Sequence, residues 1–377
     1  MNVLIVSMQR LPAAGGVNTY VIDLIQSLKR KNINVDLVCQ SDIDNLPERS
    51  LKRIDDYREL LRKGSENLPE IIINYEVGKF AFKELMKNLD IDKYDIIHSQ
   101  DGIFSKACKE VYPEKPLVGT IHGSFLNEMA LLGIIRDEFA SKLISRYDMW
   151  AVQCPTKVII VSSFLNSNLP KMDKGKFSVI YNGINPNIFY PTYQSNRTIK
   201  MMTSGDFLSY KGHDLLFESL IDLKRKGYKF ELHMFGTGYL RSTYEEFTRQ
   251  NDLPVFYRGY VSRAELVSNL QDCDIFIQPS RLENCPFSVL EAMACGCSII
   301  CSNVGGMPEM VQHNYNGLIF NNEDVMGLST SLEELIENSA KRDMMRRNSR
   351  ERAESLFSIE NMVDQTINMY KDVIMMK

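Results

Sequence analysis

Two glutamates, Glu283 and Glu291, stand in the stretch Asp274–Ser302, DIFIQPSRLENCPFSVLEAMACGCSIICS. Glu283 falls in a polar loop, and Glu291 falls in a segment with helical periodicity that begins near Phe287. The first N–H groups of a helix lack helical partners and attract anions, so those of Phe287 and Ser288 could bind a phosphate. The Glu291 side chain leans back toward that helix start, where its carboxylate could accept hydrogen bonds from a diol. Together these groups indicate a sugar nucleotide as the ligand.

The elements around the two glutamates are predicted to be strand, loop, helix and strand. A β-rich run, Asp274–Gln278, ends at Pro279-Ser280. Pro286 suits the first turn of a helix and Gly296 suits its end. Ser298–Cys301 is the next predicted strand. This order places Glu283 on a loop at the mouth of the candidate site.

The same alternation of strand and helix runs through the chain. The further predicted strands are Val3–Val6, Asn34–Cys39, Asp95–His98, Pro116–Ile121, Val158–Ser162, Thr198–Ser204, Phe230–Phe235 and Val255–Tyr260. Helices are predicted over Val17–Lys31 and Lys79–Leu89, from a start at Lys211-Gly212-His213, over Leu328–Phe357 and over Ser358–Lys377. The segment Phe177–Pro191, with Asn182-Gly183 and two prolines, is the predicted boundary between two domains.

Glycines mark two points where backbone could approach a ligand closely. Gly15-Gly16 stands at the entry of the first helix, and Gly236 opens Gly236-Thr237-Gly238 after a strand. The first pair is not part of a GxGxxG dinucleotide fingerprint. A plain tight turn is the alternative for it.

Composition restricts the class of protein. A chain of 377 residues can form two domains, and its net charge of −4 argues against a nucleic-acid partner. We find no apolar run near the ~18 residues that a membrane span needs. The first residues do not resemble a signal peptide, and the eight cysteines lack the density of a disulfide scaffold. A cytoplasmic, reduced protein is therefore expected.

The stretch SRLENCPFSVLEAMACG, with E-x7-E followed by AMACG, resembles the retaining glycosyltransferases of family 4. The resemblance covers nearly the whole chain. It implies an α/β fold of the GT-B type, with two Rossmann-like domains facing a deep cleft and a C-terminal helix crossing back to the first domain. The expected division is an acceptor domain over residues 1–184, joined by the returning helix 358–377, and a donor domain over residues 185–357.

The resemblance also assigns residues. Lys211 matches the lysine that neutralises the donor diphosphate, and His122, at the end of VGTIHG, matches a histidine near the reacting centre. Gly15-Gly16 would face the donor phosphates, and Arg258-Gly259-Tyr260 would hold the nucleobase, largely through backbone. Relatives usually carry an arginine where this chain has Asp206. Either Arg10 or Arg281 could supply the missing cation.

The predicted site therefore combines three catalytic groups with a donor-binding set. Glu291 would hold the ribose, and Glu283 with the following backbone would hold the sugar hydroxyls. The catalytic candidates are His122, Glu283 and Lys211. The donor-binding candidates are Gly15, Gly16, Lys211, Gly236, Arg258, Gly259, Tyr260, Glu283, Asn284, Cys285, Pro286, Phe287, Ser288 and Glu291.

Other chemistries could use the same types of residue. D-x-D strings could hold a divalent metal, but Lys211 and the helix N–H groups can carry the diphosphate charge, so neither metal nor cofactor is expected. A glycosidase would need its paired carboxylates on opposite sides of one bond, and these two address different parts of a nucleotide. A sugar-nucleotide 2-epimerase of the same architecture and a non-catalytic sugar-nucleotide-binding paralogue stay open. The D-x-D strings are Asp42–Asp44, Asp90–Asp92 and Asp272–Asp274.

The predicted activity is that of a retaining, metal-independent hexosyltransferase. It would move a hexose or N-acetylhexosamine from a nucleotide-diphosphate sugar, with uridine favoured as the base. The acceptor would be a saccharide, a lipid-linked sugar or a small molecule, in polysaccharide or glycoconjugate synthesis. No side chain stands out as a nucleophile, so front-face attack is expected. Basic and apolar residues are interleaved in Ser41–Glu70, but the acidic residues among them favour a solvated helix over a membrane-surface helix. A contact with the inner face of the membrane stays open.

Overall fold

The computed structural model describes residues 1–11, 13, 15–64, 68–135, 137–171, 174–193 and 198–376. The chain forms two compact units, which we call unit 1 (Met1–Tyr181 with Met362–Lys377) and unit 2 (Asn182–Asn361). The division falls at Tyr181/Asn182 and Asn361/Met362, a few residues from the expected domain boundaries.

Unit 1 contains a six-stranded parallel sheet in the order β2-β1-β3-β4-β5-β6. Its core strands are buried, as expected for a parallel sheet covered by helices on both faces. Its strands are β1 (Asn2–Ser7), β2 (Asn34–Cys39), β3 (Ile96–Ser99), β4 (Leu117–Ile121), β5 (Lys157–Ile160) and β6 (Phe177–Val179). Its α-helices are α1 (Gly16–Arg30), α2 (Glu48–Gly64), α3 (Glu70–Met86), α4 (Gly102–Val111), α5 (Phe125–Leu131), α6 (Glu138–Gln153) and α7 (Leu165–Asn168).

Unit 2 repeats this architecture, with a parallel sheet in the order β12-β11-β10-β7-β8-β9. The strands are β7 (Ile199–Ser204), β8 (Phe230–Phe235), β9 (Val255–Gly259), β10 (Ile275–Gln278), β11 (Ser298–Ser302) and β12 (Gly317–Phe320). The α-helices are α8 (His213–Arg225), α9 (Arg241–Gln250), α10 (Arg263–Gln271), α11 (Phe287–Ala294), α12 (Met307–Met310), α13 (Val325–Glu337) and α14 (Ser339–Leu356). The last helix, α15 (Ile359–Met375), begins in unit 2 and ends in unit 1.

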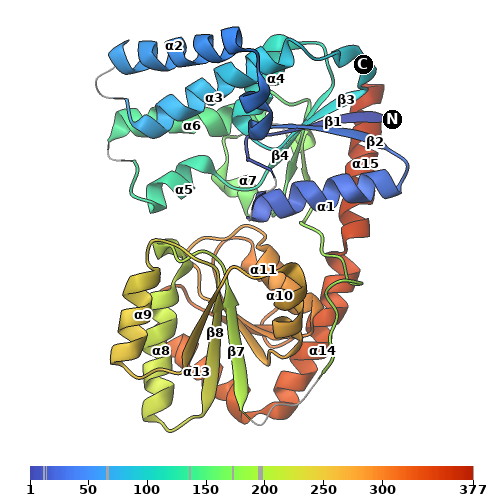
Figure 1. Ribbon diagram of the computed structural model, residues 1–377. Coiled ribbons are helices and arrows are strands. Elements are labelled where there is room, and N and C mark those ends of the chain that lie inside the picture. Colours follow the sequence, from blue (N-terminus) through green and yellow to red (C-terminus); the bar gives the residue numbers. More distant parts are fainter. Residues whose placement is uncertain are drawn as a thin grey trace. The chain divides into compact units, whose positions relative to one another are not determined.

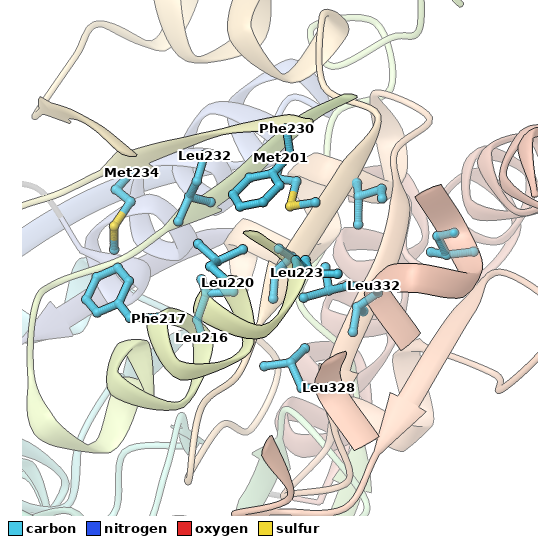
Figure 2. Packing of buried hydrophobic residues seen from close by; sticks show 14 of the residues in the cluster. Met201, Leu216, Phe217, Leu220, Leu223, Phe230, Leu232, Met234, Leu328 and Leu332 are labelled. Atoms are coloured by element: carbon cyan, nitrogen blue, oxygen red, sulfur yellow. The ribbon is translucent and has the colours of Figure 1, made fainter. Parts of the chain in front are cut away.

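Apolar side chains at helical spacing explain how α8 packs on the sheet of unit 2. Leu216, Leu220 and Leu223 share one face of α8 and are fully buried. Figure 2 shows them facing strand residues such as Met201 and Leu232. Helix α13 joins the same core, and in Figure 1 α8 and α9 lie on one side of β7 and β8, with α10 and α11 on the other. Unit 2 is thus a doubly wound α/β sheet.

The structure differs from the sequence-based expectation in two helices. The helix predicted over Lys79–Leu89 is part of α3, which begins earlier, at Glu70, and ends at Met86. The predicted helix Leu328–Phe357 is two helices, because the Asn338 side chain accepts a hydrogen bond from the N–H of Lys341 and caps α14.

The stretch Ser41–Glu70 contains a 3-10 segment and then the charged helix α2, in agreement with the solvated helix favoured there, while residues 65–67 lie outside the described part. The apolar face of α2, including Ile54, packs against α3.

Candidate functional site

Glu283 lies on the loop between β10 and α11, and three side chains donate hydrogen bonds to the same oxygen of its carboxylate. Its Oε1 atom accepts hydrogen bonds from Lys211 Nζ at 2.7 Å, Gln278 Nε2 at 2.9 Å and Ser280 Oγ at 3.0 Å. The side chains of Lys211 and Glu283 are only 17% and 10% exposed. The pair is therefore a shielded ion pair, which is stronger than one at an open surface.

Lys211 sits in a 3-10 turn, Ser209–Lys211, just before α8. Burial by itself would lower the pKa of Lys211, but the neighbouring Glu283 and Tyr210 raise it above its ordinary value. The lysine is therefore a permanent cation near the start of a helix, beside a carboxylate. Gly212 follows with φ +69°, and a Cβ there would lie 2.0 Å from the Pro279 carbonyl oxygen, so only glycine lets the turn approach β10 this closely.

The loop that carries Glu283 is fixed by backbone contacts. The Gly306 N–H donates to the Glu283 carbonyl at 3.0 Å. A Cβ at Gly305, where φ is +60°, would fall 1.6 Å from that same carbonyl oxygen. On the other side, Asn182 Nδ2 donates to the Cys285 carbonyl at 2.7 Å. These contacts give Asn182 the structural role that its turn sequence indicates.

The first turn of α11 follows directly. Pro286 is its N-cap residue, and no side chain caps the N–H groups that come after it. Ser288 turns its hydroxyl back to Gln278 Oε1 at 3.1 Å, while Glu291 is half-buried one turn later. The N-terminus of an eight-residue helix thus opens beside Lys211 and Glu283 through a shared hydrogen-bond network.

Asp206, which follows β7, lies on the same side of unit 2. Its carboxylate accepts a hydrogen bond from the hydroxyl of Tyr260 at 2.6 Å, and this bond is the main reason that the pKa of Tyr260 is raised. Asp206 also contributes to the raised pKa of Lys211, which places its charge within reach of that lysine. Nearby, Gly236 adopts φ +121°, and a Cβ there would meet the Gly205 carbonyl oxygen at 2.2 Å.

Gly259 and Arg258 complete the predicted donor set in unit 2. The Gly259 carbonyl accepts the Gly236 N–H at 2.9 Å. The Arg258 side chain is directed to His233 Nδ1 at 3.2 Å and lies over the ring of Phe256. Its guanidinium is therefore engaged on strands β8 and β9, and any nucleobase contact at this position would come from the backbone.

The two arginines considered as substitutes for a second cation already have partners. Arg281 makes bidentate contacts with Asp214 at 2.8 and 2.9 Å and also pairs with Glu323. Arg10, in unit 1, pairs with Asp44 at 2.7 Å. Either arginine would have to exchange a carboxylate for a phosphate in order to bind the donor.

The D-x-D string beside β10 also has protein partners. Asp272 pairs with Lys200, and Asp274 accepts the N–H of Lys200 at 3.0 Å. Among the described residues, no group of three or more His, Cys, Asp or Glu side chains is arranged to hold a metal ion.

His122 lies in unit 1, directly after β4. Its Nε2 is 3.1 Å from Oε1 of Gln100, and its ring contacts Tyr20 edge-on at 4.8 Å between centroids. Burial lowers the pKa of His122 to about 4, so the ring is neutral at pH 7. Gly15 and Gly16 also belong to unit 1, where Gly15 precedes α1 with φ +129°.

Unit 2 therefore brings together most of the predicted donor residues, whereas His122, Gly15 and Gly16 belong to unit 1. Sequence reasoning missed Gln278 and Ser280, which both hold Glu283. It also missed Gln100, the partner of His122. Gln278 ends a parallel strand and Gln100 directly follows one, and the carboxyl ends of parallel strands are where α/β sheets bind ligands, so that rule could have found both.

Two protein-family models match the chain, and they divide it at nearly the same place as the two units. The family model described as Glycosyltransferase Family 4 matches residues 14–188, and the model described as Glycosyl transferases group 1 matches residues 192–352. Together they take in nearly the whole chain.

Individual proteins also resemble this chain over nearly its full length. An uncharacterized glycosyltransferase of Methanocaldococcus jannaschii is 26% identical over 367 residues, 96% of each chain. The UDP-Gal:alpha-D-GlcNAc-diphosphoundecaprenol alpha-1,3-galactosyltransferase of Escherichia coli is 21% identical and covers 99% of this chain, with 98% of its own length matched. The solved structure of sucrose-phosphate synthase from Thermosynechococcus elongatus superposes with a TM-score of 0.80 at 19% identity, covering 100% of both chains. The fold predicted from the sequence, two Rossmann-like domains of the GT-B type, is confirmed.

Proposed function

The chain belongs to the glycosyltransferases of group 1 and family 4, which have the GT-B fold, and on this premise we propose that it uses a nucleotide-diphosphate sugar as donor. The observation that carries the proposal is the Lys211–Glu283 ion pair beside the open N-terminus of α11. A cation and free N–H groups can bind the diphosphate, and the adjacent carboxylate can accept hydrogen bonds from sugar hydroxyls.

Lys211 and the N–H groups of Phe287 and Ser288 would stabilise the diphosphate as it leaves. Negative charge builds on that group as its bond to the sugar breaks, and fixed donors stabilise developing charge without reorganisation. This arrangement needs no metal ion for the diphosphate. Glu291 would hold the ribose, as its place one turn into α11 indicates.

We propose that the reaction proceeds with retention, by attack on the face from which the diphosphate departs. The network around Glu283 supports this, because three donors share its Oε1 and lower its strength as a nucleophile. The departing diphosphate would accept the proton of the acceptor hydroxyl. His122, neutral at pH 7, would contribute from unit 1 as a hydrogen-bonding group rather than as a cation.

The donor base and the acceptor are proposed from the named relatives. The Escherichia coli relative uses UDP-Gal and a diphosphoundecaprenol-linked acceptor, as its name states. We accordingly propose a uridine donor and a saccharide or lipid-linked saccharide as acceptor. The structure has no helix, within the described residues, that is long and apolar enough to cross a membrane. A peripheral membrane contact through unit 1 stays a prediction.

A thermal-shift panel of UDP, GDP, ADP and their sugar conjugates, with and without a chelator, tests the proposal. One nucleotide should raise the melting temperature by several degrees regardless of chelator, because ligand binding to the folded state adds RT ln(1 + [L]/Kd). The Lys211→Ala variant should lose roughly tenfold or more in affinity for that nucleotide, because a charge-assisted hydrogen bond is removed. A Lys200→Ala variant, which breaks the ion pair with Asp272 instead, should bind like the wild type.

No shift with any nucleotide would overturn the donor site, and equal affinity in wild type and Lys211→Ala would overturn the role of the lysine. A shift that disappears with chelator would overturn the metal-independent mechanism. Transfer is then assayed with the selected sugar nucleotide and a lipid-linked or simple saccharide acceptor.

A further inference from the structure

Gln278, the last residue of β10, connects two parts of the candidate donor site. Its side chain is buried, with the residue 2% exposed, and both ends of its amide are in use. The Nε2 atom donates to Glu283 Oε1 at 2.9 Å and to Ser280 Oγ at 2.8 Å. The Oε1 atom accepts from Ser288 Oγ, in the first turn of α11, at 3.1 Å.

These bonds determine which atom of Glu283 is presented to a ligand. Lys211, Gln278 and Ser280 all donate to Oε1, so this oxygen is occupied on the protein side. The carboxylate cannot rotate without breaking several bonds at once. Its other oxygen, Oε2, is then the atom left to accept a hydrogen bond from a bound molecule, since each carboxylate oxygen has its own lone pairs.

A glutamine is suited to this place because its amide donates at one end and accepts at the other. A glutamate would repel Glu283, and an apolar residue would satisfy neither Glu283 nor Ser288. The supporting residues are themselves fixed, since Ser280 is fully buried and its carbonyl accepts the hydroxyl of Ser302. The network ties the loop carboxylate to the start of the helix.

We propose that Gln278 is a positioning residue that orients Glu283 toward the sugar of the donor and links it to the phosphate-binding turn of α11. This inference rests on the proposed function, because it concerns the sugar part of the same donor site. Gln278 itself touches neither the sugar nor the phosphate. Its effect should therefore appear in recognition of the sugar, while recognition of the nucleotide diphosphate stays intact.

The test is a Gln278→Met variant, which keeps the size of the side chain and removes its three hydrogen bonds. Calorimetry measures the affinity for a nucleotide diphosphate and for its sugar conjugate, UDP with UDP-glucose, or GDP with GDP-mannose if the panel selects guanosine. The affinity for the diphosphate should stay within about twofold of the wild type. The ratio between conjugate and diphosphate should fall by about tenfold, the effect of losing one hydrogen bond to a charged group. The rate of sugar transfer should fall with it.

The chain offers a matched control in Gln250. Its Nε2 donates to Glu246 Oε1 at 2.6 Å on the exposed face of α9, which is the same type of bond away from the site. Gln250→Met should leave both affinities and the transfer rate unchanged. If Gln278→Met does not fold, Ser288→Ala replaces it, because it removes the hydroxyl that anchors Gln278 and keeps the backbone N–H. The proposal predicts the same selective loss.

A double-mutant cycle between Gln278→Met and Ser288→Ala adds a readout that loss of packing would not produce. If the two residues act as one network, the double variant should lose no more sugar recognition than Gln278→Met alone. An unchanged affinity ratio in both single variants would overturn the inference and leave the donor site standing. An equal loss of diphosphate and conjugate binding would assign Gln278 a merely structural role. Failure of the wild type to bind any nucleotide would instead overturn the proposed function.

Discussion

The candidate site is built from charges that restrain one another. Lys211 forms an ion pair with Glu283 and also interacts electrostatically with Asp206, so two carboxylates act on one cation. A diphosphate entering this site must compete with Glu283 for the lysine. The acidic residue at position 206 is therefore expected to weaken, rather than support, the binding of the donor.

Replacing Asp206 with asparagine tests this at the scale of one residue. The Asp206→Asn variant removes a negative charge near Lys211 and keeps a group that can accept from Tyr260. Affinity for the selected nucleotide diphosphate should rise by about 1 kcal/mol, or roughly fivefold, at low salt. The gain should shrink as salt is added, because exposed charges are screened.

Asp252→Asn is the control, since Asp252 forms an exposed ion pair with Lys224 outside the site. It should leave the affinity unchanged. Weaker binding by Asp206→Asn would mean that the carboxylate assists the donor, and the charge argument would then be wrong.

At the scale of elements, the approach of the Lys211 turn to β10 depends on a glycine at the start of α8. Gly212 and Gly227 lie at the two ends of this helix and both have positive φ, +69° and +84°. They differ in their surroundings, since a Cβ at Gly212 would meet the Pro279 carbonyl oxygen and a Cβ at Gly227 would meet nothing within 4 Å.

Alanine at these two positions should therefore have unequal effects. Gly227→Ala should cost about 1 kcal/mol of stability, the strain of a left-handed backbone in an L-residue. Gly212→Ala adds a clash between backbone atoms, so it should lower the melting temperature several times more and weaken nucleotide binding by moving Lys211. Similar melting temperatures for both variants would show that the Lys211 turn can move away from β10 without loss of stability.

Helix α15 is anchored in unit 1 by a buried polar contact. The Tyr370 hydroxyl lies 2.6 Å from His98 Nδ1, and His98 Nε2 lies 2.7 Å from Thr120 Oγ1. Both rings are fully buried. The contact joins the last helix of the chain to the middle of the first sheet.

Removing that hydroxyl should loosen the helix. Tyr370→Phe leaves one nitrogen of His98 without a partner in a buried setting, which should cost about 1–3 kcal/mol of stability. Asp364→Asn, which breaks an exposed ion pair between α15 and Lys31, should cost at most about 1 kcal/mol. Denaturant unfolding of both variants gives the comparison, and equal losses would remove the special role of the buried pair.

At the scale of the whole molecule, histidines that are shielded from solvent make stability depend on pH. Burial lowers the pKa of His98 and His213 to about 3 and that of His122 to about 4. In the unfolded chain a histidine titrates near 6.5, so below that pH the unfolded state binds more protons than the folded state. Stability should then fall as pH drops from about 6.5 toward 4.

Each histidine should contribute about 1.4 kcal/mol per pH unit in this window. Asp101 opposes them in part, because burial raises its pKa to about 6 and the folded state therefore binds a proton more readily between about 4 and 6. Melting temperature measured from pH 8 to pH 5 should stay level above about 6.5 and decline below it. A His213→Gln variant should decline less steeply, and a level curve down to pH 5 in the wild type would contradict the expected protonation.

The sequence by itself determined the alternation of strands and helices, the two α/β units and the loop between β10 and α11. These features are encoded over short distances, because apolar periodicity, a proline at a helix start and a glycine at its end act within a few residues. The sequence also indicated Lys211, Glu283 and the first turn of α11 as parts of one site. It left the break at Asn338 unseen, since the polar cap competes with a continuous helical pattern.

Only the tertiary structure decided how the charges are paired. Lys211 and Glu283 are 72 residues apart, Asp206 and Tyr260 are 54 apart, and His98 and Tyr370 are 272 apart. The order of strands in each sheet determines these partners, because it places the carboxyl ends of strands that are far apart in the sequence side by side. The role inferred for Gln278 has the same origin: in the sequence it closes an apolar strand, and in the fold its amide lies between Glu283 and Ser288.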